Sequence, residues 1–148
     1  MKILFICTAN LCRSVAAEKL LRHYGGAAFE TRSRGTAAGP YGGMPGLVRD
    51  FLARAGVTQL AHKPALAGEA DVDWAEVILV MENHHYEALS DRFPQSMRKM
   101  HLFLDYCNGI TGAELEDPAG RSREVFDKVL TEIDKGIKKI IEDSEVHR

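Results

Sequence analysis

The chain begins with an unbroken apolar run, Ile3 to Ile6, that leads directly into the segment "CTANLCRS" at residues 7–14. A continuous run rich in branched apolar side chains is typical of a strand that is buried on both faces of a sheet. After residue 14, apolar residues recur at helical spacing until the glycines at 25 and 26. The start of the chain therefore predicts a strand, a loop and a helix, the opening unit of an α/β fold.

The same alternation continues along the chain. Further strands are predicted over residues 29–35, 57–63, 76–81 and 99–104. Helices are predicted over residues 47–55, over 83–93 with Asn83 as the cap, and over a final segment that contains Phe126 to Ile141. Residues 106–122 are predicted to form a polar loop. Strands that alternate with helices predict one α/β domain over residues 1–148, with a mostly parallel sheet of roughly four strands.

Charge, the apolar start of the chain and cysteine content argue against several classes of partner, location and structural site. Nineteen Lys and Arg against 21 Asp and Glu give a formal charge of −2, so no basic field indicates a nucleic-acid or anionic-membrane partner. The apolar start is too short for a signal peptide or a membrane span, which predicts a cytoplasmic protein. Three cysteines without an export signal or a CxxC pair favour reduced thiols over a disulfide framework or a zinc site.

The loop at residues 7–14 occupies the place where an open parallel sheet binds ligands. In such sheets the site is the crevice outside the carboxyl ends of the strands. The backbone N–H groups and the dipole of a helix N-terminus favour an anion such as phosphate there. Arg13 adds a planar cation that can bind two phosphate oxygens at once. We therefore predict a phosphate site at this loop.

Cys7 is the first residue of that loop. The positive field of an arginine and a helix N-terminus favours the deprotonated form of a nearby thiol, and a thiolate in a phosphate cradle is a nucleophile aimed at phosphorus. Asn10 tolerates the left-handed conformation that a tight loop needs. The other interpretation is that Cys7 packs at a strand end and Ser14 caps the helix. Cys, five residues, Arg and Ser at a strand-to-helix junction favour the catalytic interpretation.

Asp117, in "EDPAG", is a carboxyl group in the long polar loop before the last helix. Displacing an oxygen or nitrogen leaving group needs a general acid, and hydrolysis of the resulting thiophosphate needs a base. One carboxyl group can serve both steps, and Pro118 stiffens the loop that would carry it. Because Asp-Pro is also an ordinary turn signal, this motif alone leaves the role of Asp117 open.

Together these segments resemble the low-molecular-weight protein tyrosine phosphatases. The matching segments follow in the same order along nearly the whole chain: "CTANLCRS", "SRGT" at residues 33–36, "VILVM" at 77–81, and the late "DP" at 117–118. The resemblance implies a three-layer, flavodoxin-like fold with the phosphate loop between the first strand and the first helix. It implies hydrolysis of phosphotyrosine in proteins, and of small aryl phosphates in vitro, through a cysteinyl phosphate, with inorganic phosphate as product and no metal or organic cofactor. Phosphorylated proteins are then the expected partners, and the oligomeric state stays open.

The resemblance also implies a role for each matching residue. Cys7 is the nucleophile, Arg13 holds the phosphate in the transition state, and Asp117 is acid and then base. The substrate phosphate is bound by the loop residues Thr8, Ala9, Asn10, Leu11, Cys12 and Ser14. Ser14 also stabilises the Cys7 thiolate.

Three further residues receive supporting roles by resemblance. Asn10 and Ser33 brace the loop through hydrogen bonds. Cys12 closes a reversible disulfide with Cys7 under oxidation, with simple packing as the alternative. Tyr41 either lines the substrate slot as an aromatic wall or is an ordinary loop tyrosine.

Departures from the family pattern concern loop shape and substrate. Ala9 stands where the family usually has glycine, and a positive φ there would cost roughly 1 kcal/mol. Val15 replaces a common proline at the start of the helix. Ala119 and Gly120 follow the "DP", where phosphotyrosine-directed members have aromatic residues; small residues there resemble a branch that includes protein arginine phosphatases. Leu11 resembles the tyrosine-directed members, so the two signals conflict.

Two other functions and a metal site compete with this interpretation. Arsenate reductases of one type share the loop but need a downstream cysteine pair, whereas Cys107 stands alone. A non-catalytic phosphate-binding module would not need Asp117. His84 and His85 are adjacent on a predicted helix and should point in different directions, so no metal site is predicted.

Overall fold

Four parallel strands form the central sheet of the computed structural model, which describes residues 1–40 and 42–146. Their order is β2-β1-β3-β4. In the middle, β1 (Lys2–Cys7) pairs with β2 (Glu30–Gly35) on one side and with β3 (Val77–Val80) on the other. The far edge is β4 (Met100–Leu102), paired with β3. This order matches the flavodoxin-like arrangement, with its switch point between β1 and β3.

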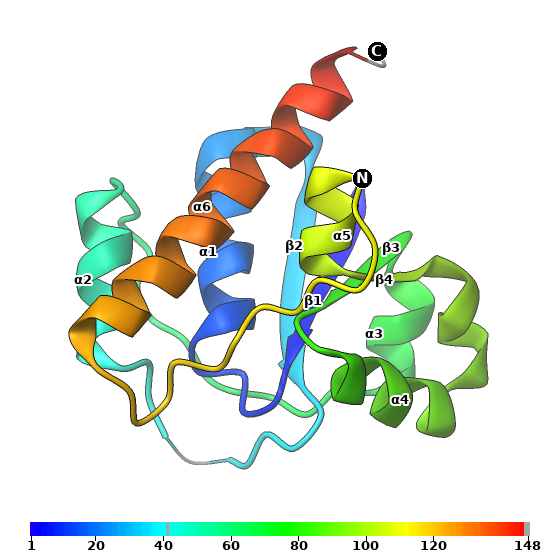
Figure 1. Cartoon of the computed structure of the whole chain (residues 1–148). Coiled ribbons are helices and arrows are strands. Elements are labelled where there is room, and N and C mark those ends of the chain that lie inside the picture. Colours follow the sequence, from blue (N-terminus) through cyan, green and yellow to red (C-terminus); the bar gives the residue numbers. More distant parts are fainter. Residues whose placement is uncertain (41, 147–148) are drawn as a thin grey trace.

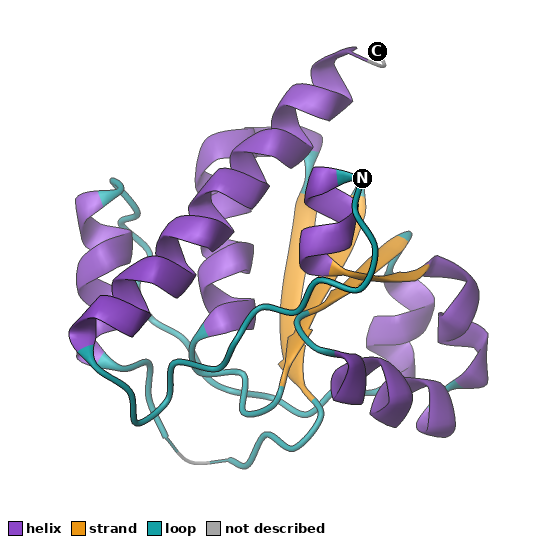
Figure 2. Cartoon of the chain, in the orientation of Figure 1, coloured by secondary structure: helices purple, strands orange, loops and turns teal. Residues whose placement is uncertain are grey.

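Helices cover both faces of this sheet (Figures 1 and 2). One face carries α1 (Arg13–Gly25), α5 (Phe103–Asn108) and the long α6 (Arg123–Val146), with α2 (Gly46–Arg54) packed against α1 and α6. The other face carries α3 (Glu69–Trp74) and α4 (Asn83–Arg92). Two short 3-10 helices, η1 (Gly26–Ala28) and η2 (Pro94–Lys99), complete the connections. The predicted three-layer α/β fold with four parallel strands is confirmed.

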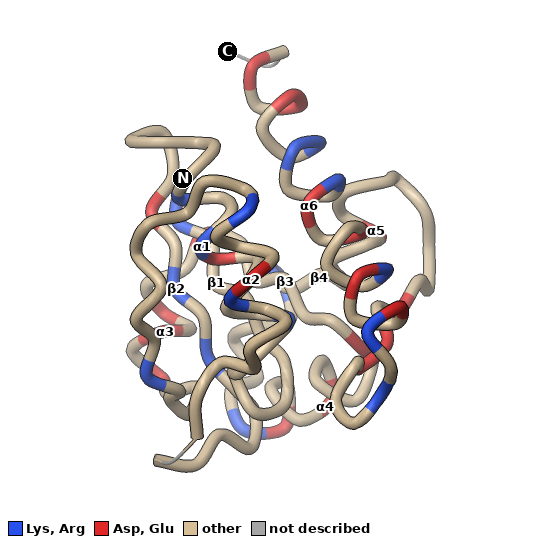
Figure 3. The backbone as a smooth tube through the Cα atoms, turned by 90° about the vertical axis from the view of Figure 1, so that its left-hand side faces the viewer, with Lys and Arg blue, Asp and Glu red and all other residues tan. Residues whose placement is uncertain are grey.

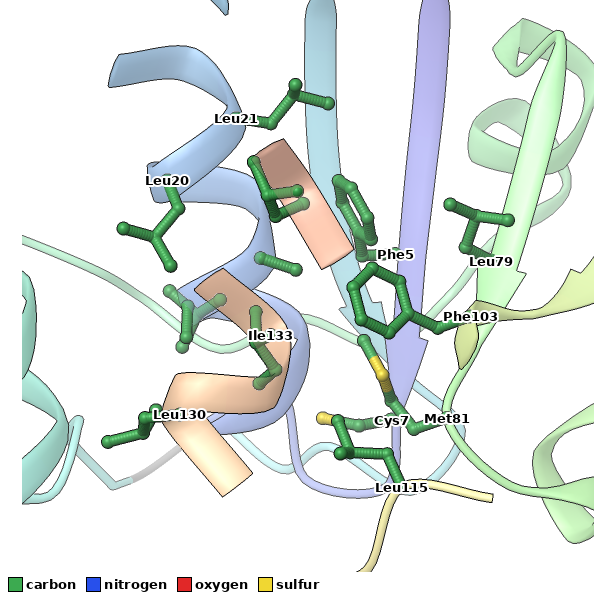
Figure 4. Packing of buried hydrophobic residues seen from close by; sticks show 14 of the residues in the cluster. Phe5, Cys7, Leu20, Leu21, Leu79, Met81, Phe103, Leu115, Leu130 and Ile133 are labelled. Atoms are coloured by element: carbon green, nitrogen blue, oxygen red, sulfur yellow. The ribbon is translucent and has the colours of Figure 1, made fainter. Parts of the chain in front are cut away.

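The side chains of β1 alternate between the two layers, which decides where the candidate nucleophile points. Leu4 and Ile6 belong to the core under α3 and α4, whereas Phe5 and Cys7 belong to the core under α1, α5 and α6. Figure 4 shows Cys7 at the lower end of that core beside Met81 and Leu115. Because β1 ends at the switch point of the sheet, the Cys7 side chain lies at the crevice where ligands bind in this fold.

Several local predictions were wrong. No strand forms over residues 57–63, since the buried ammonium of Lys19 donates to the carbonyls of Gln59 and Ala61 (2.7 and 2.9 Å) in place of a neighbouring strand. The strand predicted over residues 99–104 ends at Leu102, and the chain turns directly into α5, which occupies the start of the predicted polar loop. The N-cap of α4 is Glu82, one residue before Asn83. The short α3 escaped prediction because six residues give too little periodicity.

Basic and acidic residues are interspersed along the helices (Figure 3). In the described part of the chain, no helix combines the length and the hydropathy that a membrane span needs.

Candidate active site

The loop between β1 and α1 curls around a cavity of about 180 Å³. The cavity is lined by Cys7, Thr8, Ala9, Leu11, Cys12, Arg13, Pro45, Asp117, Ala119 and Phe126. Asn10 takes the left-handed conformation (φ 59°) and is the single non-glycine residue with positive φ in the described ranges. The strain considered for Ala9 is therefore absent, because the left-handed position falls on the residue type that tolerates it.

A chain of hydrogen bonds ends at the Cys7 sulfur. The Asn10 Nδ2 group donates to Ser14 Oγ at 2.9 Å, and Ser14 Oγ lies 2.9 Å from Cys7 Sγ. Because Ser14 Oγ already accepts from Asn10, its own proton is free to point at the sulfur. Asn10 and Ser14 are fully buried, and Cys7 is 3% exposed. The arrangement can hold a negatively charged sulfur with a fixed donor.

Segments from two other parts of the chain brace the loop from outside. His62 Nε2 donates to the Asn10 carbonyl at 2.6 Å, and the Ala65 N–H donates to Asn10 Oδ1 at 3.0 Å. The Thr36 N–H donates to the Cys7 carbonyl at 2.9 Å. Gly35 lies so close to the loop that an added Cβ would stand 2.3 Å from the Thr8 carbonyl oxygen. The glycine of "SRGT" is therefore required for close approach of two backbones.

Arg13 is 2% exposed and is held by two acceptors from distant segments. Its Nη1 donates to Glu82 Oε2 at 2.8 Å and to the Leu115 carbonyl at 2.7 Å. Burial works to raise the pKa of Glu82, but the hydrogen bond and charge of Arg13, together with His84, outweigh it and lower that pKa. The carboxylate is therefore ionised at neutral pH, and the guanidinium is fixed in one orientation.

Asp117 lies across the cavity from the loop. Its Oδ2 is 3.9 Å from Arg13 Nη2, and its side chain is 50% exposed. The other oxygen, Oδ1, accepts from the Ala119 N–H at 3.0 Å, so the turn after "DP" orients the carboxylate. The structure therefore brings together the three residues that the sequence proposed for catalysis, Cys7, Arg13 and Asp117, around one cavity.

The remaining predicted site residues divide into two groups. Thr8, Leu11 and Cys12 line the cavity, and burial, with the nearby Cys7 and Asp117, raises the pKa of Cys12 to about 12 despite Arg13. Cys12 is thus a protonated thiol at neutral pH.

Ser33 is buried, but its hydroxyl donates to Glu18 Oε1 at 3.0 Å, so it braces α1 and not the loop, contrary to expectation. Tyr41 lies outside the described residues.

Glu82, His84 and His85 form a cluster that the sequence argument missed. The expectation that adjacent histidines point apart was wrong, since their ring centroids are 4.0 Å apart and the ligand atoms of all three residues lie within 4.8 Å. Both ring nitrogens of His85 already have partners, however: Nδ1 accepts from the Glu82 N–H and Nε2 bonds Thr8 Oγ1. Glu82 is paired with Arg13. The cluster is a hydrogen-bond network. A metal ion that bound these atoms would have to replace their existing hydrogen bonds.

The sequence signal for these partners was weak but present. Glu82 follows the buried strand β3 with only Met81 between them, so a parallel sheet places its carboxylate at the same edge as the loop after β1. Leu115 and His62 had no such signal, because they reach the site from irregular segments.

Comparison with known proteins agrees with this geometry. The family model described as "Low molecular weight phosphotyrosine protein phosphatase" matches residues 2–148. A protein-arginine-phosphatase of Geobacillus stearothermophilus is 28% identical over 141 residues, 95% of this chain and 94% of the relative. The low molecular weight protein-tyrosine-phosphatase Wzb of Escherichia coli K12 is 30% identical over 140 residues, 90% and 88% of the two chains. The solved structure of the YwlE arginine phosphatase from Geobacillus stearothermophilus superposes with a TM-score of 0.91, at 27% identity over 99% of this chain and 94% of that one.

Proposed function

The chain belongs to the low molecular weight phosphotyrosine protein phosphatase family, and we propose that it removes phosphate from phosphotyrosine in proteins through a cysteinyl-phosphate intermediate. One observation carries this proposal: Cys7, the buried Arg13 and the half-exposed Asp117 line a single cavity. A site that only binds phosphate would have no use for a carboxyl group at its mouth.

The proposed reaction has two steps. The Cys7 thiolate attacks phosphorus, an S–P bond forms, and the P–O bond to the leaving group breaks while Asp117 protonates the departing oxygen. Asp117 then takes a proton from water, the water oxygen attacks phosphorus, and inorganic phosphate leaves with Cys7 restored as thiolate. Arg13 uses Nη1 for Glu82 and Leu115, which leaves Nη2 and Nε to hold two phosphate oxygens in the transition state.

The loop supplies the remaining stabilisation. Ser14 donates to the Cys7 sulfur in the thiolate state, and the backbone N–H groups of residues 8–13 surround the phosphate oxygens. Cys12, a neutral thiol, is the proposed partner for a reversible disulfide when Cys7 is oxidised. These steps use side chains and water alone, so we propose no metal or organic cofactor.

The walls of the cavity support phosphotyrosine as substrate. Leu11, Pro45 and Phe126 are apolar and line the space beside the loop, which suits an aromatic ring. Among the described residues that line the cavity, Asp117 is the one carboxylate, and the proposed mechanism reserves it for proton transfer. A guanidinium leaving group would gain from an additional carboxylate there.

Phosphoarginine is the second candidate substrate, because two observations favour it. Ala119 contributes a small side chain to the rim where an aromatic wall would otherwise stand. A named arginine phosphatase also matches this chain over 95% of its length. The apolar wall at Leu11 leads us to place phosphotyrosine first.

Turnover of three substrates tests the proposal: p-nitrophenyl phosphate, a phosphotyrosyl peptide and a phosphoarginyl peptide of the same sequence. We expect kcat/KM for the phosphotyrosyl peptide to exceed that for the phosphoarginyl peptide by at least about 10-fold. The reverse order would establish the second candidate. Leu11→Thr should lower the preference for the aryl substrate. Binding of phosphate without turnover of any substrate would reduce the protein to a binding module, and reduction of arsenate without phosphatase activity would make it a redox enzyme.

A reducing compartment fits this chemistry. Cys7, Cys12 and Cys107 are all free thiols, and the mechanism depends on a reduced nucleophile. We therefore propose the cytoplasm as the place of action and phosphorylated proteins as partners.

A further inference from the structure

The first turn of α4 contacts both ends of the phosphate loop. At the start of the loop, Thr8 Oγ1 lies 2.7 Å from His85 Nε2. At its end, Arg13 Nη1 donates to Glu82 Oε2 at 2.8 Å. The two contacts join residues that are 77 and 69 positions apart in the chain, yet Glu82 and His85 are neighbours at one helix terminus. The loop is thus clamped from one side at both of its ends.

The hydrogen-bond direction at His85 is determined by its surroundings. The Glu82 N–H donates to His85 Nδ1 at 3.1 Å, so this nitrogen carries no proton and the proton of the neutral ring sits on Nε2. His85 therefore donates to Thr8 Oγ1. The side chain is fully buried. Burial, with the nearby His84 and Arg13, lowers the pKa of His85 to about 3 against the opposing charge of Glu82, so the ring stays neutral.

The same short segment also holds the loop that carries Asp117. The Asn83 N–H donates to Glu114 Oε2 at 2.7 Å. The Leu115 N–H donates to the Met81 carbonyl at 2.9 Å, and Figure 4 shows Leu115 beside Met81 and Cys7. Residues 81–85 therefore touch the start of the phosphate loop, its arginine and the segment just before the general acid.

We propose that His85 is a positioning residue for the phosphatase reaction: it fixes the Thr8 end of the phosphate loop to α4, opposite the Glu82 contact at the Arg13 end. This inference rests on the proposed function and deepens it. His85 touches no reacting atom and acts through Thr8. Its ring also completes the N-terminus of α4 by accepting the Glu82 N–H, so an experiment must separate this capping contact from the contact to the loop.

Two substitutions break the contact from opposite sides. His85→Asn keeps an acceptor within reach of the Glu82 N–H but lacks the length to reach Thr8. Thr8→Val removes the hydroxyl and keeps the shape of the side chain, and Thr8→Ser restores the hydroxyl. Leu89→Ala is the matched control. Leu89 is 1% exposed on the same helix, but it packs in the core between the sheet and α3, away from the phosphate loop.

The readouts are kcat and KM for p-nitrophenyl phosphate, binding of inorganic phosphate by calorimetry, and the thermal midpoint. We expect His85→Asn and Thr8→Val each to lower kcat on the order of 10-fold or more, with weaker phosphate binding, because small displacements of a positioned group cost that much. Thr8→Ser should recover most of the loss of Thr8→Val. The double variant should be no worse than the poorer single variant, since both remove one interaction. Leu89→Ala should lower the midpoint and change kcat by less than about twofold.

Three results would overturn the inference. The first is a Leu89→Ala variant that loses as much activity as His85→Asn at an equal loss of stability. The second is a double variant in which the two single losses multiply. The third is normal kcat with normal phosphate binding in His85→Asn. If His85→Asn does not fold, Thr8→Val against Thr8→Ser decides the question. Absence of turnover in the wild-type protein would refute the proposed function instead, and phosphate binding by the variants would still test the clamp.

Discussion

The phosphate loop and the loop that carries Asp117 face each other across one cavity but are built in opposite ways. Asn10, Arg13 and Ser14 are at most 2% exposed, and polar atoms of Asn10 and Arg13 are bonded to three separate segments, at residues 62–65, Glu82 and Leu115. Asp117 is half exposed, and its oriented contact is a single bond within its own turn. The phosphate loop is fixed by contacts with the rest of the fold. The loop that carries Asp117 is fixed at Leu115 by a backbone hydrogen bond to Met81, and Asp117 itself is exposed to solvent.

This difference matches the two tasks that the proposed mechanism sets. Every phosphate ester presents the same three oxygens, so the group that holds them gains from rigid, preorganised donors. Leaving groups differ in size and acidity, so the segment above them gains from exposure and from freedom to vary in sequence. We therefore expect changes in the phosphate loop to affect all substrates alike and changes around Asp117 to affect them unequally.

Replacing the nucleophile should have the largest effect. Cys7→Ser is expected to lower kcat by at least about 10⁴-fold for every substrate, because a neutral hydroxyl in this position is a poor nucleophile. Steady-state kinetics with p-nitrophenyl phosphate would measure it. Cys107→Ser is the matched control, since Cys107 is buried beside Gly136 and away from the cavity, and it should retain wild-type kcat. Substantial activity in Cys7→Ser would refute the covalent mechanism.

Removing the general acid should distinguish substrates, as the exposed loop predicts. Asp117→Asn is expected to lower kcat on the order of 10²- to 10³-fold for phenyl phosphate and much less for p-nitrophenyl phosphate, whose leaving group needs little protonation. A series of aryl phosphates would give the dependence of log kcat on leaving-group acidity. Glu116→Gln, a neighbouring exposed carboxylate paired with Lys128, should leave that dependence unchanged. Equal losses across the series would assign Asp117 a binding role instead.

A pair of substitutions at Asn10 should test the rigidity of the phosphate loop. Asn10→Ala removes two side-chain hydrogen bonds and places alanine at φ 59°, with an expected loss of about 2 to 4 kcal/mol in the free energy of unfolding. Asn10→Gly removes the same bonds but accepts the backbone angle, so it should be more stable than Asn10→Ala by about 1 kcal/mol. Urea denaturation measures both. Equal stability of the two variants would mean that the left-handed residue carries no strain.

The parts of this site that lie within one stretch of sequence could be predicted. Cys7, Asn10, Arg13 and Ser14 share the loop after β1, and hydrophobic patterning placed that loop between a strand and a helix. The left-handed Asn10 followed from the chemistry of its side chain. The local pattern was therefore sufficient to place this loop and its residues in the fold.

The braces of the loop could not be predicted in the same way. Glu82, His85 and Leu115 meet the loop from 69 to 102 residues away, and their partners are set by the register of β3 and by the path of an irregular segment. Lys19 shows the same limit for the fold, because a buried ammonium holds two carbonyls of a segment that the sequence favoured as a strand. Contacts of this kind have no periodic signature along the chain.

The smallest expected effect is a pH dependence of the free energy of unfolding that originates at His85, on the α4 side of the phosphate loop. The pKa of His85 is about 3 in the folded protein, against an ordinary value of 6.5. As the pH falls below about 6.5, the unfolded chain takes up a proton at this residue and the folded chain does not, so the free energy of unfolding falls by about 2 kcal/mol by about pH 5. Glu82, whose pKa is lowered, adds to this loss only below about pH 4.5, which isolates His85 in the window above.

Urea denaturation at several pH values across that window would measure the dependence. His85→Asn should flatten the curve, and His101→Gln, a substitution of an exposed histidine on β4, should leave it as in the wild type. A curve that flattens in Asp117→Asn but not in His85→Asn would contradict the assignment of this pH dependence to His85. A flattened curve in His85→Asn would assign the pH dependence to this buried histidine.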